Sequence, residues 1–149
     1  MIGTTYVFSY FSQLASVGVT GIPSQGGYYF MPDFEVCRAS MSKRGILNGK
    51  QMCEAILKEH QVAVSQSQSS QLKKRSVYFP FSFQLLPGSD FLREDEELTV
   101  RLCFVDFDGL FAMQMLGNYG VLDEHFVQRA APKVVEGIQR LKSFVQKHT

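Results

Sequence analysis

The stretch Thr99 to Phe107, TVRLCFVDF, decides the fold, because its side chains alternate with the period of two that marks a β-strand. One face of this strand is predicted to carry Val100, Leu102 and Phe104, and the other Arg101, Cys103, Val105 and Phe107. Both faces are mostly apolar, so we expect the strand to be covered on both sides.

Punctuated apolar runs before this strand predict further elements. The run Tyr28 to Met31 lies between a Gly pair and Pro32, which is typical of a buried strand. Asn48 and Gln51 have the spacing of a capping box, and an amphipathic helix is predicted from Gly49 to His60. A short helix within Tyr6 to Val19 and a strand beginning at Gln61 to Val64 are also predicted.

The chain after the central strand is predicted to be helical from Asp123 onward. Pro132 is tolerated only in the first turn of a helix, so a second helix should begin there. Its inward face is predicted to carry Val134, Val135, Ile138, Leu141, Phe144 and Val145. The expected fold is a single α+β domain over residues 1–149, with a small antiparallel or mixed sheet covered by helices and long C-terminal helices.

Composition narrows the classes of function. The 149 residues are 45% hydrophobic and carry a net charge of +1, which supports a packed core and argues against binding to nucleic acid or to an acidic membrane. No apolar run is long enough to span a bilayer, and residues 1–21 lack the basic start of a signal peptide. We therefore expect a cytoplasmic protein.

The cysteines and histidines show no metal-site spacing. They are Cys37, Cys53 and Cys103, with His60, His125 and His148. We expect reduced thiols and no metal. A Cys–His nucleophilic pair stays open, since nothing in the sequence singles one out.

Arg101 is the candidate ligand-binding residue. A guanidinium stays protonated in a protein, so on a strand with two apolar faces it needs an anion. From periodicity alone, the favoured alternative is structural: pairing with Glu96 or Glu97, or a side chain that reaches out at the strand's start.

Three other polar motifs are interpreted as surface features. Lys43, in Ser40-Met41-Ser42-Lys43, resembles a Schiff-base lysine but is expected in a polar loop. Asp106 and Asp108 with Gly109 lack the other ligands of a calcium loop and are interpreted as a β-turn. The basic run 73–75 is expected to be solvated.

Several stretches together resemble the C-terminal small domain of class I/II, fold-type-I aminotransferases that use pyridoxal 5'-phosphate (PLP). They are PSQGGYYFMPDF at 23–34, GKQMCEAILKEHQVA at 49–63, LLPGSDF at 85–91, ELTVRLCFVDFDG at 97–109 and LDEHFVQRAAPKVVEGIQRL at 122–141. Each stretch alone is weak, but their order and spacing over almost the whole chain is fairly specific.

The resemblance implies transfer of an amino group between an amino acid and a 2-oxo acid, with PLP as electron sink. It also implies that Arg101 binds the substrate α-carboxylate through a bidentate fork. The complete enzymes are usually homodimers. No catalytic or cofactor-binding residue is assigned in this chain by the resemblance.

The resemblance also implies missing parts. The family's Schiff-base lysine, phosphate-binding loop and pyridine-nitrogen partner lie upstream of the motif at 23–34, and only 22 residues precede Pro23. Lys43 lies downstream, so it cannot be that lysine. We therefore expect a fragment that does not bind PLP alone. The alternative is a non-catalytic α+β regulatory or interaction module, or a truncated inactive product; genomic sequence upstream would separate these readings.

Residues 64–84 interrupt the resemblance. The family runs from G-V-A directly into L-L-P-G, whereas here 21 residues separate Ala63 from Leu85. Val64-Ser65 can be encoded by a consensus splice donor, and residues 79–84 by a pyrimidine run ending in CAG. We hypothesise an irregular insertion that is a translated intron; the alternative is an ordinary surface-loop insertion.

We predict that deletion of residues 64–84 raises the melting temperature, because the joined strand would no longer be interrupted by a polar tract and an aggregation-prone run. Thermal melts of both chains test this, together with cDNA read across the junction. If the deletion unfolds the domain, the segment is a genuine structural insertion. The same conclusion holds if every transcript encodes the segment and the segment packs into the core.

Overall fold

Strand β4, Val100–Cys103, lies inside the sheet, with β2 (Tyr29–Asp33) on one side and β3 (Gln84–Pro87) on the other. Strand β1, Thr20–Ile22, extends the order to β1-β2-β4-β3, and every pairing is antiparallel. The computed structural model describes residues 12–22, 29–60, 84–104, 108–120 and 124–149.

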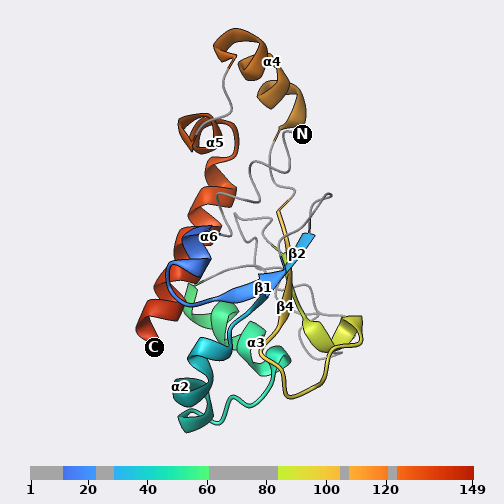
Figure 1. Ribbon diagram of the computed structural model, residues 1–149, viewed down its shortest axis with the longest axis vertical. Coiled ribbons are helices and arrows are strands. Elements are labelled where there is room, and N and C mark those ends of the chain that lie inside the picture. Colours follow the sequence, from blue (N-terminus) through green and yellow to red (C-terminus); the bar gives the residue numbers. More distant parts are fainter. Residues whose placement is uncertain (1–11, 23–28, 61–83, 105–107, 121–123) are drawn as a thin grey trace.

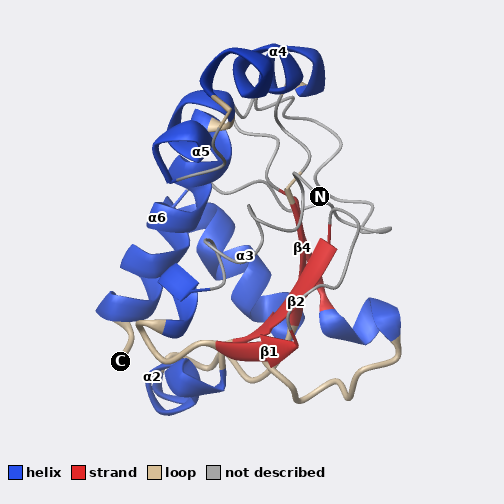
Figure 2. Cartoon of the chain, turned by 45° about the horizontal axis from the view of Figure 1, so that its top comes forward, coloured by secondary structure: helices blue, strands red, loops and turns tan. Residues whose placement is uncertain are grey.

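The helices confirm the predicted α+β class. Their bounds are η1 Glu35–Cys37, α2 Arg38–Lys43, α3 Gly49–His60, η2 Gly88–Phe91, α4 Gly109–Tyr119, α5 Glu124–Ala130 and α6 Pro132–Lys147. Helices α3, α5 and α6 lie to one side of the sheet, and α4 lies at the far end of the molecule beyond α5 (Figures 1 and 2). Within the described helices, none is both long and apolar enough to cross a bilayer.

The two long amphipathic helices begin where the sequence predicts. The Gln51 amide donates to Asn48 Oδ1 at 2.9 Å, and the Gln51 side chain accepts from the Leu47 amide at 2.7 Å, one residue earlier than in a standard capping box. Pro132 occupies the first turn of α6. Of the predicted inward face of α6, all members are buried except Val135, which is half-buried.

Three predicted boundaries need correction. The strand at β2 continues through Pro32 and Asp33, and Pro32 pairs opposite Gly21 of β1. An added Cβ at Gly21 would lie 2.5 Å from the Met31 carbonyl oxygen, so the two strands approach closely there. The N-terminal helix gives way to a turn at residues 16–18, before Val19. Strand β4 ends at Cys103; residues 105–107 lie outside the described part, as do the predicted strand at 61–64 and residues 64–83 of the proposed insertion.

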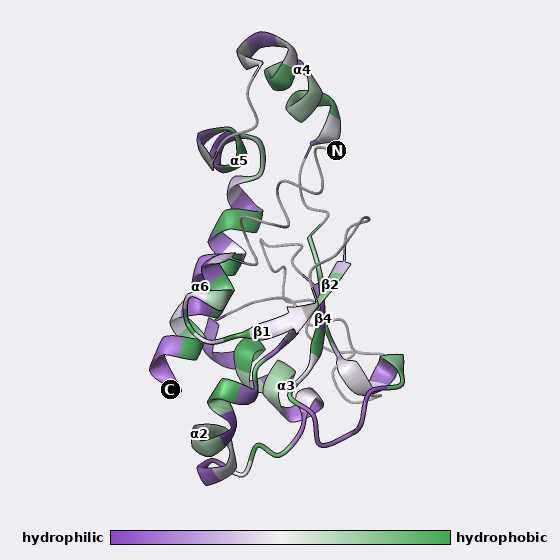
Figure 3. Ribbon diagram, in the orientation of Figure 1, coloured by the Kyte–Doolittle hydropathy of each residue, from purple (hydrophilic) through white to green (hydrophobic). Residues whose placement is uncertain are grey.

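Helix α4 is absent from the sequence prediction. Asp108, interpreted as part of a β-turn, instead caps this helix, and its carboxylate accepts from the Phe111 amide at 3.0 Å. The helix has no charged residue and no clear polar face, so its periodicity carries little signal. Figure 3 shows its apolar colouring, and Leu110 and Met113 are exposed.

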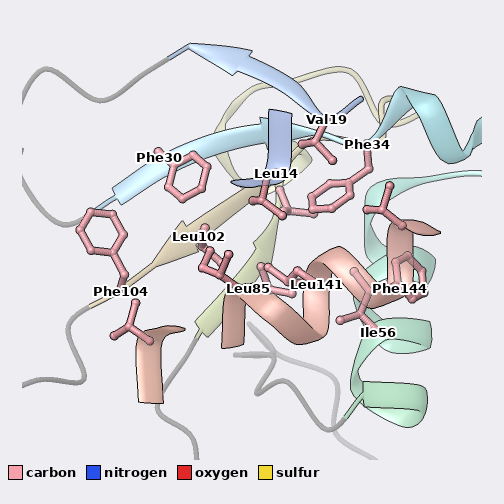
Figure 4. Packing of buried hydrophobic residues seen from close by; sticks show 14 of the residues in the cluster. Leu14, Val19, Phe30, Phe34, Ile56, Leu85, Leu102, Phe104, Leu141 and Phe144 are labelled. Atoms are coloured by element: carbon pink, nitrogen blue, oxygen red, sulfur yellow. The ribbon is translucent and has the colours of Figure 1, made fainter. Parts of the chain in front are cut away.

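The core forms where the sheet meets α3 and α6. Phe30, Leu102 and Leu85 come from the three adjacent strands β2, β4 and β3 and point toward these helices (Figure 4). Leu141 and Phe144 from α6 pack with Ile56 of α3 in the same cluster, as Figure 4 shows. The buried face of β4 is thus the one predicted to carry Val100, Leu102 and Phe104.

A carboxylate joins the ends of the helices below the sheet. Glu59 on α3 accepts from Arg44, which follows α2, and from Lys147 Nζ at 2.9 Å at the end of α6. Burial raises the pKa of Glu59, but hydrogen bonds from Lys147, Arg44 and His148 outweigh it and lower the pKa to about 2. Glu59 therefore ties three segments of the chain together while it is ionised.

His148 has two partners that compete for one nitrogen. Its Nε2 lies 3.0 Å from Arg44 Nη1 and 3.3 Å from Glu59 Oε2, and its ring is buried against Phe144. A guanidinium can only donate, so Nε2 accepts from Arg44 only when this nitrogen carries no hydrogen. When Nε2 carries a hydrogen, it donates to Glu59 instead.

We predict that Glu59→Gln lowers the free energy of unfolding at pH 7 by about 1–3 kcal/mol, because the cations around it lose their counter-charge. A lowered pKa stabilises the fold only while the group is ionised. This contribution is present above the ordinary value of 4.5 and is lost as the pH falls toward about 2. The free energy of unfolding of wild type, measured by denaturant titration, should therefore fall between pH 4.5 and about pH 2. That of Glu59→Gln should fall less over the same range.

Glu136→Gln is the matched control, since Glu136 forms an i,i+4 pair with Arg140 and is nearly half exposed. It should change stability by less than about 0.5 kcal/mol. Equal effects of the two substitutions would contradict the role given to Glu59.

Candidate functional site

Arg101 is the second residue of β4 and lies on the face of the sheet opposite the core. Its register partner on β3 is Leu86, and the neighbouring Cys103 pairs with Tyr29 on β2. Side chains of paired residues share a face, so Tyr29, Leu86 and Arg101 lie together. Both faces of β4 were expected to be covered. On this face Cys103 is buried as expected, whereas Tyr29 is 48% exposed and Arg101 is only partly buried.

Two aromatic rings flank the guanidinium. Arg101 Cζ lies 4.6 Å from the centroid of the Tyr29 ring and 4.0 Å from that of the Phe91 ring. Tyr29 belongs to the strand on one side of β4, whereas Phe91 ends η2, which follows the strand on the other side. Each cation–π contact is worth about 0.5–2 kcal/mol, depending on how far water is excluded.

The ion pair of Arg101 with Glu96 or Glu97, one part of the structural alternative, is not formed among the described residues. Glu97 Oε2 accepts from Arg93 Nε at 2.8 Å and from Thr99 Oγ1 at 3.2 Å, and so serves other partners. Arg101 Nε is buried and has no hydrogen-bond partner in the described part of the chain. Leaving a buried donor unsatisfied costs about 1–3 kcal/mol, and an anionic ligand would remove that cost.

Gly88 begins η2 and lies close to Thr99, which places Phe91, the last residue of η2, beside Arg101. Its amide donates to the Thr99 carbonyl oxygen at 2.8 Å, and an added Cβ would lie 2.0 Å from Thr99 Oγ1. Leu92 then ends η2 in the left-handed conformation, with φ of 63°. Local sequence patterns single out neither Tyr29 nor Phe91; the Pro-Gly pair at 87–88 is the one local signal of a close approach before Phe91.

The other candidates do not join this site. Lys43 is exposed at the last position of α2, so it lies in a helix and not in the predicted loop. The three cysteines are buried and form no disulfide with one another. Burial raises the pKa of the Cys37 thiol to about 11, and burial with the charges of Asp90 and Glu54 raises that of Cys53 to about 12, which disfavours a reactive thiolate.

Metal ligands do not gather in the described part of the chain, where no three His, Cys, Asp or Glu residues are suitably close. Asp106 and the basic run 73–75 lie outside the described residues. Comparison with models of known protein families finds no match for the chain, and a search of curated proteins finds none either. Arg101, flanked by Tyr29 and Phe91, is therefore the candidate site in the described part of the chain.

The arrangement suits the binding of an anion in the plane of the guanidinium. A cation–π contact is electrostatic and needs no hydrogen bond, and the buried Nε of Arg101 has no hydrogen-bond partner among the described residues. The two rings therefore restrain Arg101 while its Nε–H remains unpaired in the described part of the chain. A carboxylate that meets an edge can accept two parallel hydrogen bonds.

We predict that Gly88→Ala lowers the free energy of unfolding by about 1–3 kcal/mol, because the new methyl group would overlap the Thr99 side chain and displace η2. Chemical denaturation measures the loss. Gly117→Ala in α4 is the control: an added Cβ there meets nothing within 4 Å, and Ala favours a helix by roughly 0.5–1 kcal/mol. A Gly88→Ala chain as stable as wild type would show that the close approach to Thr99 is not required.

Proposed function

We propose that this chain is the small domain of a PLP-dependent aminotransferase and that Arg101 binds the α-carboxylate of its amino-acid and 2-oxo-acid substrates. The observation that carries the proposal is the buried Nε of Arg101, which has no partner among the described residues, on a guanidinium flanked by Tyr29 and Phe91. The ordered motifs in the sequence supply the reaction class. The complete enzyme is proposed to be a cytoplasmic homodimer.

The role of Arg101 follows from its geometry. A planar fork fixes both the position and the orientation of a carboxylate, and a point charge such as a lysine ammonium does not. Orienting the amino acid before reaction is worth a large share of the barrier in a bimolecular reaction. The residue would therefore act on binding and orientation, while the bond-making groups lie elsewhere.

The described residues do not fit a PLP site. A lysine that forms a Schiff base needs a desolvated or charge-tuned setting, and Lys43 is exposed at the end of a short helix. No cofactor step is therefore assigned to this chain. In the proposal, the cofactor is held by a large domain that the family carries upstream.

We predict that Arg101→Ala, in a polypeptide that includes the large domain, lowers kcat/KM for every amino-acid substrate. Loss of a charge-assisted bidentate contact should cost about 2–5 kcal/mol. Arg101→Lys should recover only part of this loss because it lacks the fork. Steady-state kinetics of the folded variants provide the measurement, and unchanged kinetics for Arg101→Ala would return the residue to a structural role.

We predict that the 149-residue chain alone gives no specific absorbance band when titrated with PLP and does not transaminate. Lys43→Ala is the control, since it removes the lysine of the Ser-Met-Ser-Lys motif. A reproducible band in the wild-type chain that Lys43→Ala abolishes would contradict both the prediction and the exposed setting found for Lys43.

A further inference from the structure

We propose that Tyr29 and Phe91 are positioning residues that hold the Arg101 guanidinium in one plane and so make the site prefer flat carboxylates to tetrahedral anions. The inference rests on the proposed function, which assigns a carboxylate to Arg101. It adds two residues and a ligand selectivity that the proposed function does not contain.

Aromatic rings hold the Arg101 guanidinium where carboxylates were expected. An arginine side chain is usually held by carboxylates or carbonyl oxygens, which occupy its donors. Of the two acidic residues expected to pair with it, Glu97 is engaged by Arg93 and Thr99, and no ion pair joins Glu96 to Arg101 among the described residues. The contacts found for the Arg101 guanidinium are instead the rings of Tyr29 and Phe91, at 4.6 and 4.0 Å from Cζ.

The direction of the Arg101 donors depends on how the two rings meet the guanidinium. Tyr29 is on β2 and Phe91 follows β3, the strands on either side of β4, and Cζ lies within cation–π distance of both ring centroids. In the proposal the two rings lie against opposite faces of the guanidinium, so that it cannot turn about its long axis without losing a ring contact. Its donors therefore keep one plane before any ligand arrives, which reduces the ordering cost of binding.

The shape of the ligand decides whether it fits between the two rings. A carboxylate is planar, and in a fork-to-fork pair it extends the plane of the guanidinium. It would therefore lie in the gap that the two rings already leave for Arg101. A phosphate is tetrahedral and projects oxygens above and below that plane, toward the aromatic rings. Because the face of a ring carries negative charge, these oxygens would be repelled.

The half-exposed Tyr29 marks the side from which a ligand can reach the site. Phe91 is less exposed and ends η2, whose first residue Gly88 packs closely against Thr99, so it forms the fixed wall. The two residues thus have different expected tolerances. Tyr29 can be replaced at a partly solvated strand position with little risk to folding, whereas Phe91 carries more packing.

The experiment follows the Arg101 Nε–H signal in ¹⁵N-labelled full-length chain by NMR, with acetate and then inorganic phosphate near pH 6 as probes. Arg101→Lys identifies the signal by removing it. In wild type we expect a signal shielded by the rings, a response to acetate, and a weaker response to phosphate at equal concentration.

The variants Tyr29→Leu and Phe91→Leu should each reduce the shielding and weaken acetate binding about 2- to 5-fold, the equivalent of one cation–π contact. They should also reduce the preference for acetate over phosphate. Phe111→Leu is the matched control, because Phe111 is a comparably exposed ring on α4 and should change neither quantity. If Phe91→Leu fails to fold, Tyr29→Leu still decides the outcome.

Two results would overturn the proposal and are distinguishable. If acetate binds but Tyr29→Leu retains the wild-type affinity and selectivity, the rings do not position Arg101, while the carboxylate assignment survives. If the wild-type signal does not respond to acetate at all, the assignment of Arg101 in the proposed function fails, and the selectivity fails with it.

Discussion

Strand β4 is paired along both edges, and this double pairing fixes which of its side chains face the core and which face the other side of the sheet. With β2 on one side and β3 on the other, its register is set twice, so no residue of β4 can change face without breaking two ladders. Leu102 must then enter the core beside Phe30 and Leu85, and Arg101 must leave it. The placement of a permanent cation on the opposite face is thus a consequence of burying its neighbours.

Glu59 and Arg101 have different surroundings: oppositely charged groups surround the first, and aromatic rings flank the second. At the helix ends, Glu59 is surrounded by Arg44, Lys147 and His148, and this saturation lowers its pKa and ties three segments together. On the sheet, Arg101 is flanked by aromatic rings, and its buried Nε has no hydrogen-bond partner among the described residues. A saturated cluster contributes to stability, whereas a restrained and unsaturated cation is available to a ligand, which is why the second is the candidate site.

Strong periodicity gave reliable predictions. Helix α3 has the predicted bounds, Gly49–His60, and α6 begins at Pro132, because an amphipathic stripe and a capping or proline signal agree at both places. Helix α4 was missed since it has neither charges nor a polar face. The end of β2 was misplaced because a proline usually closes a strand, whereas Pro32 lies within the pairing of β2 with β1, opposite Gly21.

The sequence by itself determined the α+β class, the alternation of β4 and therefore the identity of Arg101 as the residue to examine. Those features depend on residues a few positions apart in the sequence, where apolar side chains repeat every two residues in a strand and every three to four in a helix. Only the tertiary structure decided that Glu97 serves Arg93 and Thr99, and that Tyr29 and Phe91 flank the guanidinium. These contacts join separate elements, and their geometry depends on strand order, register and the close approach of Gly88 to Thr99, none of which a local pattern encodes.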